Sequence, residues 1–254
     1  MSRDYIIHTP DEIERIRVAA AMTGKARDLI ADSVRPGMST KELDLIAGEI
    51  ITSMGGKCAF LGYAGFPGNI CISVNDEVVH GIGDPNRFIL KGDLVKVDVG
   101  VAFNGGIGDT ARTVYVGDEP CPADEQQLMD VTRDALEAGI KAALPGNHIR
   151  DISAAIQQVA KKNGIAIVRD FVGHGCGVKL HEPPEVPNYV TPMRGPRLQP
   201  GMVLAIEPMF NLGTYKVYVE RNDWTVRTRD GKKSAHFEHM VLITNDQPEV
   251  LTRA

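Results

Sequence analysis

The chain has 254 residues, 43% of them hydrophobic and 24% charged, which is ordinary for a soluble globular protein with a sizeable core. Its net charge of -5 and its lack of like-charge blocks argue against nucleic acid or a membrane surface as a partner. No run approaches the roughly 20 apolar residues of a membrane helix, the N-terminus does not form a signal peptide, and the four cysteines form no CxxC pair. We therefore expect a protein of the reducing cytoplasm.

Four helices are predicted along the chain. The first begins at Thr9-Pro10-Asp11-Glu12, where proline takes the first helical position. The second begins at the capping box Ser39-Thr40-Lys41-Glu42, in which serine and glutamate each satisfy a free amide. The third runs from about Ala123 to Ala142. The fourth carries apolar residues at helical spacing from Ile149 and closes at Asn163-Gly164.

Strand-like runs lie between and after these helices. They are Leu94 to Val101, Ala111 to Val116, Met202 to Ile206, Tyr215 to Val219 and His239 to Thr244. Each half of the chain therefore contains helices followed by strands, which favours an α+β fold with helices packed on an antiparallel sheet.

Several landmarks recur at one offset. Pro36-Gly37 and Pro145-Gly146 each precede a predicted helix, 145 − 36 = 109 residues apart. The pairs Gly55 and Gly164, Gly92 and Gly201, and Asp98 and Glu207 have the same offset. We interpret the chain as one domain, residues 1–254, made of two duplicated halves at about 10–120 and 121–250. The alternative is the ordinary use of glycine at helix ends and strand starts.

Asp98 and Asp109 flank a predicted turn at Asn104-Gly105. If the chain reverses there, the two aspartates fall nearly opposite each other on paired strands, with Cβ atoms within about 5 Å. Two ionised carboxylates that close repel each other unless a cation lies between them. The alternative is a plain hairpin with two solvated aspartates.

Further candidates lie in the second half. Glu207 ends the apolar run from Met202, and Glu238 enters the apolar strand that begins at His239. Buried carboxylates are rare unless they are paired or bind metal. His174 lies in the glycine-rich Gly173-His174-Gly175, where backbone and ligands can approach closely. Four carboxylates and one imidazole suit a pair of divalent ions bridged by shared carboxylates, rather than a structural zinc.

Several segments match the pattern of one known family. They are Cys71 to Gly81, Asp98-Val99-Gly100, Gly108 to Thr113, Gly173-His174-Gly175, His181-Glu182-Pro183-Pro184, Glu207-Pro208 and Phe237-Glu238-His239. Through these segments the chain resembles the type I methionine aminopeptidases over nearly its whole length. The resemblance implies the pita-bread fold, an α+β architecture of two pseudo-symmetric halves with a central antiparallel sheet covered by helices. It also implies removal of the initiator methionine from nascent proteins, with preference for a small second residue.

The resemblance further implies the roles of individual residues. Asp109 and Glu238 would bridge two divalent ions (cobalt, manganese, iron or zinc), Asp98 would complete one metal site, and His174 with Glu207 the other. A hydroxide between the metals would attack the carbonyl after methionine, with Glu207 handling its proton. His181 would stabilise the developing oxyanion, and His80 would lie near the amino end or the leaving nitrogen. A surface or satisfied loop histidine is the alternative for these two, and it is our expectation for His8, His148, His236 and His239.

The methionine pocket implied by the family motifs has apolar and aromatic walls, which suit a thioether. Its predicted lining is Phe60, Tyr63, Phe66, Cys71, His80, His181 and Trp224. Plain core positions are the alternative for Phe60 and Phe66. Ile107, Cys176 and Leu180 also depart from the family pattern, in which histidine, an aliphatic residue and phenylalanine are usual. These departures leave the metal ligands intact and affect the shape of the pocket.

Three rival interpretations remain. A prolidase or X-Pro aminopeptidase would share the ligand set but usually carries an extra N-terminal domain, and only 97 residues precede Asp98. A type II enzyme would need a long insertion between His174 and Glu207, which are 33 residues apart. A metal-free binding module of the same fold should lack several ligands. We therefore expect a monomeric aminopeptidase whose partners are nascent N-termini, with the ribosome as a candidate place of encounter.

Overall fold

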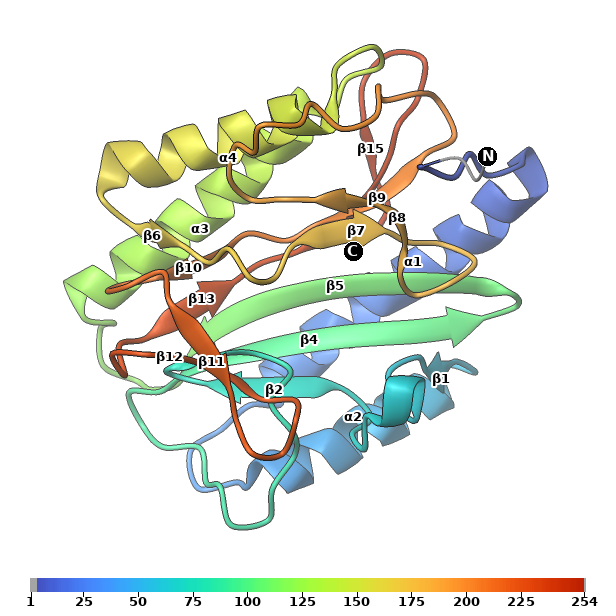
Figure 1. Ribbon diagram of the computed structural model, residues 1–254. Coiled ribbons are helices and arrows are strands. Elements are labelled where there is room, and N and C mark those ends of the chain that lie inside the picture. The colour runs from blue at the N-terminus through green and yellow to red at the C-terminus, as the bar shows by residue number, and fades with distance from the viewer. Residues whose placement is uncertain (1–3, 254) are drawn as a thin grey trace.

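In the computed structural model, which describes residues 4–253, helices pack on antiparallel sheets as predicted (Figure 1). The helices are α1 (Pro10–Asp32), α2 (Thr40–Ser53), α3 (Ala123–Ala142) and α4 (Ile149–Asn163). Predicted start signals are confirmed for α1 and α2: Glu12 closes a capping box on Thr9, and Glu42 closes one on Ser39. Among the described residues, none of the helices has the length and apolarity needed to cross a bilayer.

The strands are more numerous than the sequence predicted; β4 and β5 extend further toward their shared turn, whereas the other predicted strands are shorter. They are β1 (Lys57–Cys58), β2 (Cys71–Val74), β3 (Glu77–Val79), β4 (Leu94–Phe103), β5 (Gly106–Tyr115), β6 (Ala166–Ile167), β7 (Gly173–Gly175), β8 (Glu182–Val186), β9 (Val203–Ile206), β10 (Met209–Asn211), β11 (Val217–Val219), β12 (Val226–Thr228), β13 (Ser234–His236), β14 (His239–Leu242) and β15 (Glu249–Val250). A short 3-10 helix, η1, spans Tyr63–Gly65. The five predicted strands correspond to β4, β5, β9, β11 and β14.

The strands form four hydrogen-bonded sheets. In the first half, β4 pairs with β1, β2 and β5, and in the second half the order is β15-β14-β9-β7-β8. Two smaller sheets, β13-β10-β6 and β11-β12-β3, flank them. Helix α1 runs behind the long β4–β5 hairpin, whereas α3 and α4 cover the second half (Figure 1).

The β4–β5 hairpin turns where the sequence predicted. Phe103 pairs with Gly106, and the two turn residues Asn104 and Gly105 have φ of 47° and 79°, as a tight two-residue hairpin requires. The register places Asp109 opposite Gly100 and Asp98 opposite Ala111. The two aspartates are therefore diagonal neighbours on the same face of the hairpin, two positions out of direct opposition.

The 109-residue offset recurs in the backbone itself. Isolated bridges join Ser39 to Phe88 and His148 to Arg197, and both members of the second bridge are 109 residues beyond the first. The paired glycines 37 and 146 both have φ of 90°, and glycines 92 and 201 have φ of 91° and 92°. Strand β1 likewise corresponds to β6, and the start of β4 to the start of β9. The two halves therefore share a common frame.

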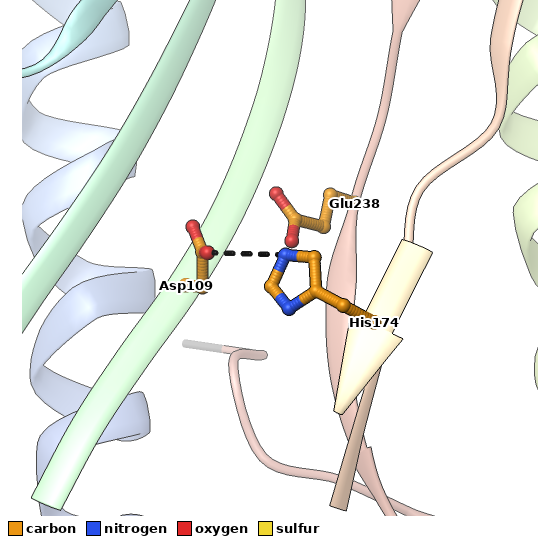
Figure 2. A group of neighbouring side chains, drawn as sticks. All are labelled: Asp109, His174 and Glu238. Carbon is orange, nitrogen blue, oxygen red and sulfur yellow. Dashed lines mark ion pairs between the residues drawn. The ribbon is translucent and has the colours of Figure 1, made fainter. Parts of the chain in front are cut away.

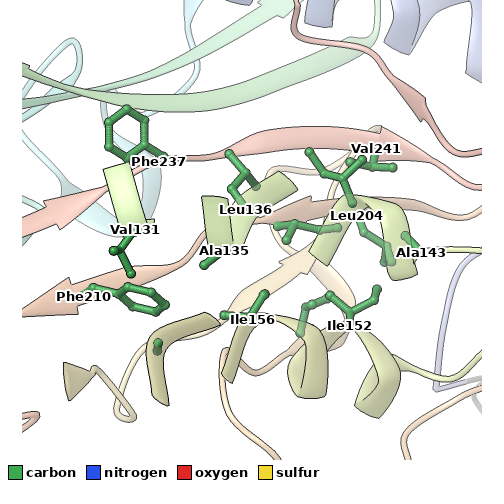
Figure 3. Packing of buried hydrophobic residues seen from close by; sticks show 14 of the residues in the cluster. Val131, Ala135, Leu136, Ala143, Ile152, Ile156, Leu204, Phe210, Phe237 and Val241 are labelled. Carbon is green, nitrogen blue, oxygen red and sulfur yellow. The ribbon is translucent and has the colours of Figure 1, made fainter. Parts of the chain in front are cut away.

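The core of the second half lies between α3, α4 and the sheets beneath them (Figure 3). Apolar residues at helical spacing on both helices, such as Leu136 and Ile156, contact strand residues such as Leu204 and Phe210. A separate cluster in the first half packs α1 and α2 against β2 and β4. These cores hold the helices on the outer side of the sheets, away from the seam between the two halves.

The seam between the halves is formed by β5 and the segment that joins β13 to β14. Thr113 Oγ1 donates to the carbonyl of His236 at 2.7 Å, and the Glu238 amide donates to the carbonyl of Ala111 at 3.0 Å. Thr110 Oγ1 donates to the Glu238 carbonyl at 2.6 Å. These bonds hold Glu238 beside the strand that carries Asp109.

Candidate metal centre and cavity

Three side chains from distant parts of the chain converge at the seam (Figure 2). Asp109 lies on β5, His174 on β7, and Glu238 between β13 and β14. One potential ligand atom from each lies within 4.8 Å of the other two, and His174 Nε2 is 3.8 Å from Asp109 Oδ2. This spacing is small enough for one cation to contact all three.

The two other predicted ligands lie beside this group. Glu207, which follows β9, places Oε1 3.5 Å from His174 Nε2, and Asp98 shares the face of the hairpin with Asp109. All five predicted ligands line one cavity of about 580 Å³, its open mouth included. The structure therefore brings together residues that span 141 positions of sequence, from 98 to 238.

Burial disfavours the ionised form of these carboxyl groups in the metal-free protein and so raises their pKa values. It raises the pKa of Asp98 to about 7 and that of Glu207 to about 8. Burial, together with the neighbouring carboxylates, raises the pKa of Asp109 and of Glu238 well above the ordinary range. Four acidic groups this close are best ionised together with a counter-charge among them.

The polar atoms of the cluster suit a divalent cation. Asp98 Oδ1, Asp109 Oδ1 and Glu238 Oε1 are buried without a hydrogen-bond partner among the described residues. Buried oxygens are normally satisfied, and a cation would satisfy these three. His174 Nδ1 lies 2.9 Å from the Gly175 carbonyl, which can only accept, so Nδ1 carries the proton and Nε2 presents a lone pair to the carboxylates. The residues therefore fit a metal ion.

The wall of the cavity is apolar and aromatic. Phe60, Phe66, Cys71 and Leu180 are buried in one cluster, with Trp224 packed against it. Phe66 and Trp224 meet edge to face, with ring centroids 5.1 Å apart. All the predicted pocket residues line the same cavity as the ligands. Phe60 and Phe66 are thus both core and cavity residues, so the two alternatives for them were not exclusive.

The two predicted catalytic histidines also face this cavity. His80 packs edge to face on Phe171 and Trp224, and burial lowers its pKa to about 4. His181 leans on His174, with ring centroids 4.2 Å apart, and burial lowers its pKa too. Both rings are therefore neutral near pH 7.

His236 was the residue that the sequence analysis missed. We expected a surface or loop histidine, but its side chain is 1% exposed and its Nε2 lies 3.3 Å from Glu207 Oε2. Burial lowers the pKa of His236 to about 4. The signal was the two-residue spacing from His236 to Glu238, which places alternate side chains on one face of an extended chain.

The other three histidines make structural contacts away from the cavity. His8 Nε2 is 3.1 Å from Glu182 Oε2, and His239 Nδ1 is 2.8 Å from Thr252 Oγ1. His148 is the N-cap residue of α4, and its Nδ1 lies 3.0 Å from the Gly195 carbonyl. Our expectation for these three agrees with these contacts.

Ile107, Cys176 and Leu180, which depart from the family pattern, lie at different places relative to the cavity. Leu180 lines the cavity, whereas Ile107 packs between the apolar cluster of the cavity wall and the core cluster behind it. Cys176 is fully buried in that core cluster. Among the three, only Leu180 therefore contacts the space available to a substrate.

Comparison with known proteins places this site in a class. The model of metallopeptidase family M24 matches residues 14–245. A methionine aminopeptidase of Clostridium acetobutylicum is 44% identical over 247 residues, which cover 97% of this chain and 98% of the relative. The crystal structure of methionine aminopeptidase from Thermotoga maritima superposes with a TM-score of 0.94 at 40% identity, covering 98% of this chain and 100% of the other.

The fold and the acidic cavity define a metal-dependent peptidase of the pita-bread type. The chain belongs to metallopeptidase family M24. A prolidase from Pyrococcus furiosus shares the fold at a TM-score of 0.77 and 23% identity, but only 66% of that chain is covered. The full-length agreement lies with the methionine aminopeptidases.

Proposed function

We propose that the chain removes the N-terminal methionine from polypeptides by hydrolysing the first peptide bond. The observation that carries the proposal is the single cavity in which four carboxylates and His174 face an apolar wall. One side of the cavity can hold cations, and the other can hold a flexible thioether. The natural substrates would be the N-termini of nascent proteins with a small second residue.

The proposed cofactor is a pair of divalent ions. Asp98, Asp109, His174, Glu207 and Glu238 would hold them. Bound ions would supply Lewis-acid activation of the scissile carbonyl and of water, and a ligand position for the free α-amine. Carboxylates and imidazole accept manganese, iron, cobalt or zinc.

The chain's own residues would orient the substrate and move protons. Glu207 would accept the proton of the attacking water at a carboxylate oxygen, and His236 at 3.3 Å would hold that carboxylate in place. His181 would donate to the oxyanion that develops on the scissile carbonyl. His80, packed edge to face against aromatic rings, would lie by the substrate's amino end or the leaving nitrogen.

Peptide hydrolysis tests this proposal directly. With added divalent metal, the purified protein should release methionine from Met-Ala-Ser but not from the N-acetylated peptide, because acetylation removes the amine that the site would bind. Leu-Ala-Ser serves as the matched side-chain control and should be cleaved more slowly. Equal cleavage of the free and acetylated peptides would contradict the proposal.

The metal count is tested separately. Titration of metal-free protein with manganese or cobalt, followed by calorimetry, should show two ions per chain. His174→Ala should lower that number or weaken binding, because it removes one nitrogen ligand. A single site that is unaffected by His174→Ala would contradict the ligand assignment while leaving the fold unchanged.

A further inference from the structure

The side chain of Tyr63 reaches across the cavity mouth to His181. Its hydroxyl lies 2.8 Å from His181 Nδ1, and the two rings are 5.2 Å apart. Tyr63 belongs to the first half of the chain and His181 to the second, 118 residues later. This hydrogen bond therefore ties a pocket wall of one half to a histidine of the other.

The loop that carries Tyr63 is held in an unusual conformation. Gly62, Ala64 and Gly65 all have positive φ, and Ala64, at 47°, has a side chain that disfavours this region. Backbone bonds close the loop from both sides: Gly62 donates to Phe66 at 2.8 Å, and Tyr63 to Phe60 at 2.9 Å. A strained backbone held in this way indicates a position that the surrounding structure fixes.

The loop that carries His181 is fixed as well. Glu182 accepts from the amides of Val178 at 3.0 Å and Lys179 at 2.7 Å, and its other oxygen lies 3.1 Å from His8 Nε2. The backbone of His181 therefore has little freedom. What remains open is which of the two ring nitrogens carries the proton, and the partner of Nδ1 decides that.

The two neighbouring histidines, His174 and His181, have different partners at Nδ1. His174 Nδ1 faces a carbonyl, which can only accept, whereas His181 Nδ1 faces a phenolic hydroxyl. A phenol is a good donor, and a neutral imidazole nitrogen without a proton is a good acceptor. With the hydroxyl donating, the single proton of a neutral His181 ring sits on Nε2.

We propose that Tyr63 is a positioning residue that sets His181 in the tautomer opposite to that of His174. His174 then offers an Nε2 lone pair to a cation, while His181 offers an Nε2–H to the scissile carbonyl oxygen. The second half of this statement rests on the proposed function, whereas the tautomer does not. Tyr63 acts through His181 and is not itself required to contact the reacting atoms.

The tautomer can be measured without any assay of activity. In protein labelled with ¹⁵N at histidine, the His181 signals, assigned by their loss in His181→Asn, should show an unprotonated Nδ1 and a protonated Nε2 at pH 8. Tyr63→Phe should shift these signals toward a mixture of tautomers. A protonated Nδ1 in the unaltered protein, or unchanged signals in Tyr63→Phe, would overturn the proposal.

Kinetics supply a second test. Tyr63→Phe keeps the aromatic wall, so kcat for Met-Ala-Ser should fall about tenfold or more while KM and metal content change little. Tyr218→Phe is the matched control, because Tyr218 is equally exposed at 41% and lies outside the cavity. In a His181→Ala background, Tyr63→Phe should cause no further loss, because the hydroxyl has lost its partner.

The outcomes separate the two proposals. An additive loss in the double variant would show that Tyr63 acts independently of His181 and would contradict its positioning role. Failure of the unaltered protein to cleave methionyl peptides would contradict the proposed function, and the ¹⁵N signals would still decide the tautomer.

Discussion

Positions 65 and 174 are equivalent in the 109-residue offset, yet the chain fills them with glycine and histidine. In the first half, Gly65 closes the strained η1 turn that presents Tyr63 to the cavity. In the second half, His174 lies on a short strand and points its ring at Asp109. The same place in the frame thus belongs to a loop that supports the cavity wall in one half and carries a candidate metal ligand in the other.

Positions 98 and 207 show the complementary case. Both are carboxylates at equivalent places, but Asp98 lies within a long strand, whereas the longer side chain of Glu207 projects from the residue after β9. The glycine turns at equivalent positions have the same backbone conformation in both halves, while the side chains that face the cavity differ. Backbone geometry can therefore be duplicated while the chemistry of the two halves diverges.

The largest expected effect is a loss of kcat that differs between variants of the two equivalent carboxylates, Asp98 and Glu207. Glu207→Gln should lower kcat by roughly 10²–10⁴-fold even at saturating metal, because it removes a proton acceptor as well as a ligand charge. Asp98→Asn should instead weaken metal binding and recover part of its activity when metal is added. Glu185→Gln, an exposed change on β8, is the control and should leave activity intact. Equal and unrecoverable losses at 98 and 207 would mean that the two positions kept the same role.

Metal removal should make the stability of the protein depend on pH, because Asp98 of one half and Glu207 of the other are costly to ionise without a cation. In metal-free protein the pKa values of Asp98 and Glu207, about 7 and 8, lie above their ordinary 3.8 and 4.5. The folded state then binds more protons than the unfolded state, so the unfolding free energy falls as pH rises from about 4 to about 8. A bound cation removes this penalty.

The gap in Tm between metal-loaded and EDTA-treated protein should therefore widen from pH 5.5 to pH 8. Differential scanning calorimetry at the two pH values measures it. In Glu207→Gln the Tm difference should increase less between pH 5.5 and pH 8, because the substitution removes one of the titrating groups. A gap that is independent of pH would show that the buried carboxylates do not govern stability.

Equivalent glycines should respond unequally to alanine. Gly92→Ala introduces only backbone strain, since nothing lies within 4 Å of the added Cβ, and should cost about 1–2 kcal/mol of unfolding free energy. At Gly201 the added Cβ would also lie 2.8 Å from Ile7 Cγ2, which should add about 1 kcal/mol or more. Urea denaturation of both variants tests this. Equal midpoints would show that the segment around Ile7 moves away from the added Cβ at no cost in free energy.

The smallest effect concerns the helix starts. Ser39 Oγ accepts from the Glu42 amide at 3.1 Å, so Ser39→Ala should lower the unfolding free energy by about 1 kcal/mol. His148 occupies the equivalent place, where its amide donates to the Asp151 carboxylate at 2.7 Å while its own ring faces the Gly195 carbonyl. His148→Ala should therefore shift the urea midpoint less than Ser39→Ala does. The reverse order would mean that the two caps are not equivalent in energy.

Local signals predicted the helices and the main hairpin well. The caps at Thr9 and Ser39 and the turn at Asn104-Gly105 act over a few residues, so the sequence alone determines them. Strands such as β7 and β8 could not be predicted in this way. They are short, contain glycine or proline, and exist because β9 and its neighbours offer partners far away in sequence.

The candidate site was predictable in its members and less so in its geometry. The resemblance and the buried acidic positions predicted the candidate ligands, and every predicted site residue does line the cavity. Their roles stay predictions. The contact of His236 with Glu207 and that of Tyr63 with His181 depend on packing between the halves, which no local pattern encodes.

The division of the candidate ligands between the two halves of the chain has a consequence for assembly. Asp98 and Asp109 precede the exposed 117–120 segment, while His174, Glu207 and Glu238 follow it. Two fragments separated at that segment would each hold an incomplete set of donors, and only their docked complex would bind metal tightly. The free energy of metal binding would then add to the free energy of association of the two fragments. The measured metal affinity would therefore report how completely the fragments reassemble.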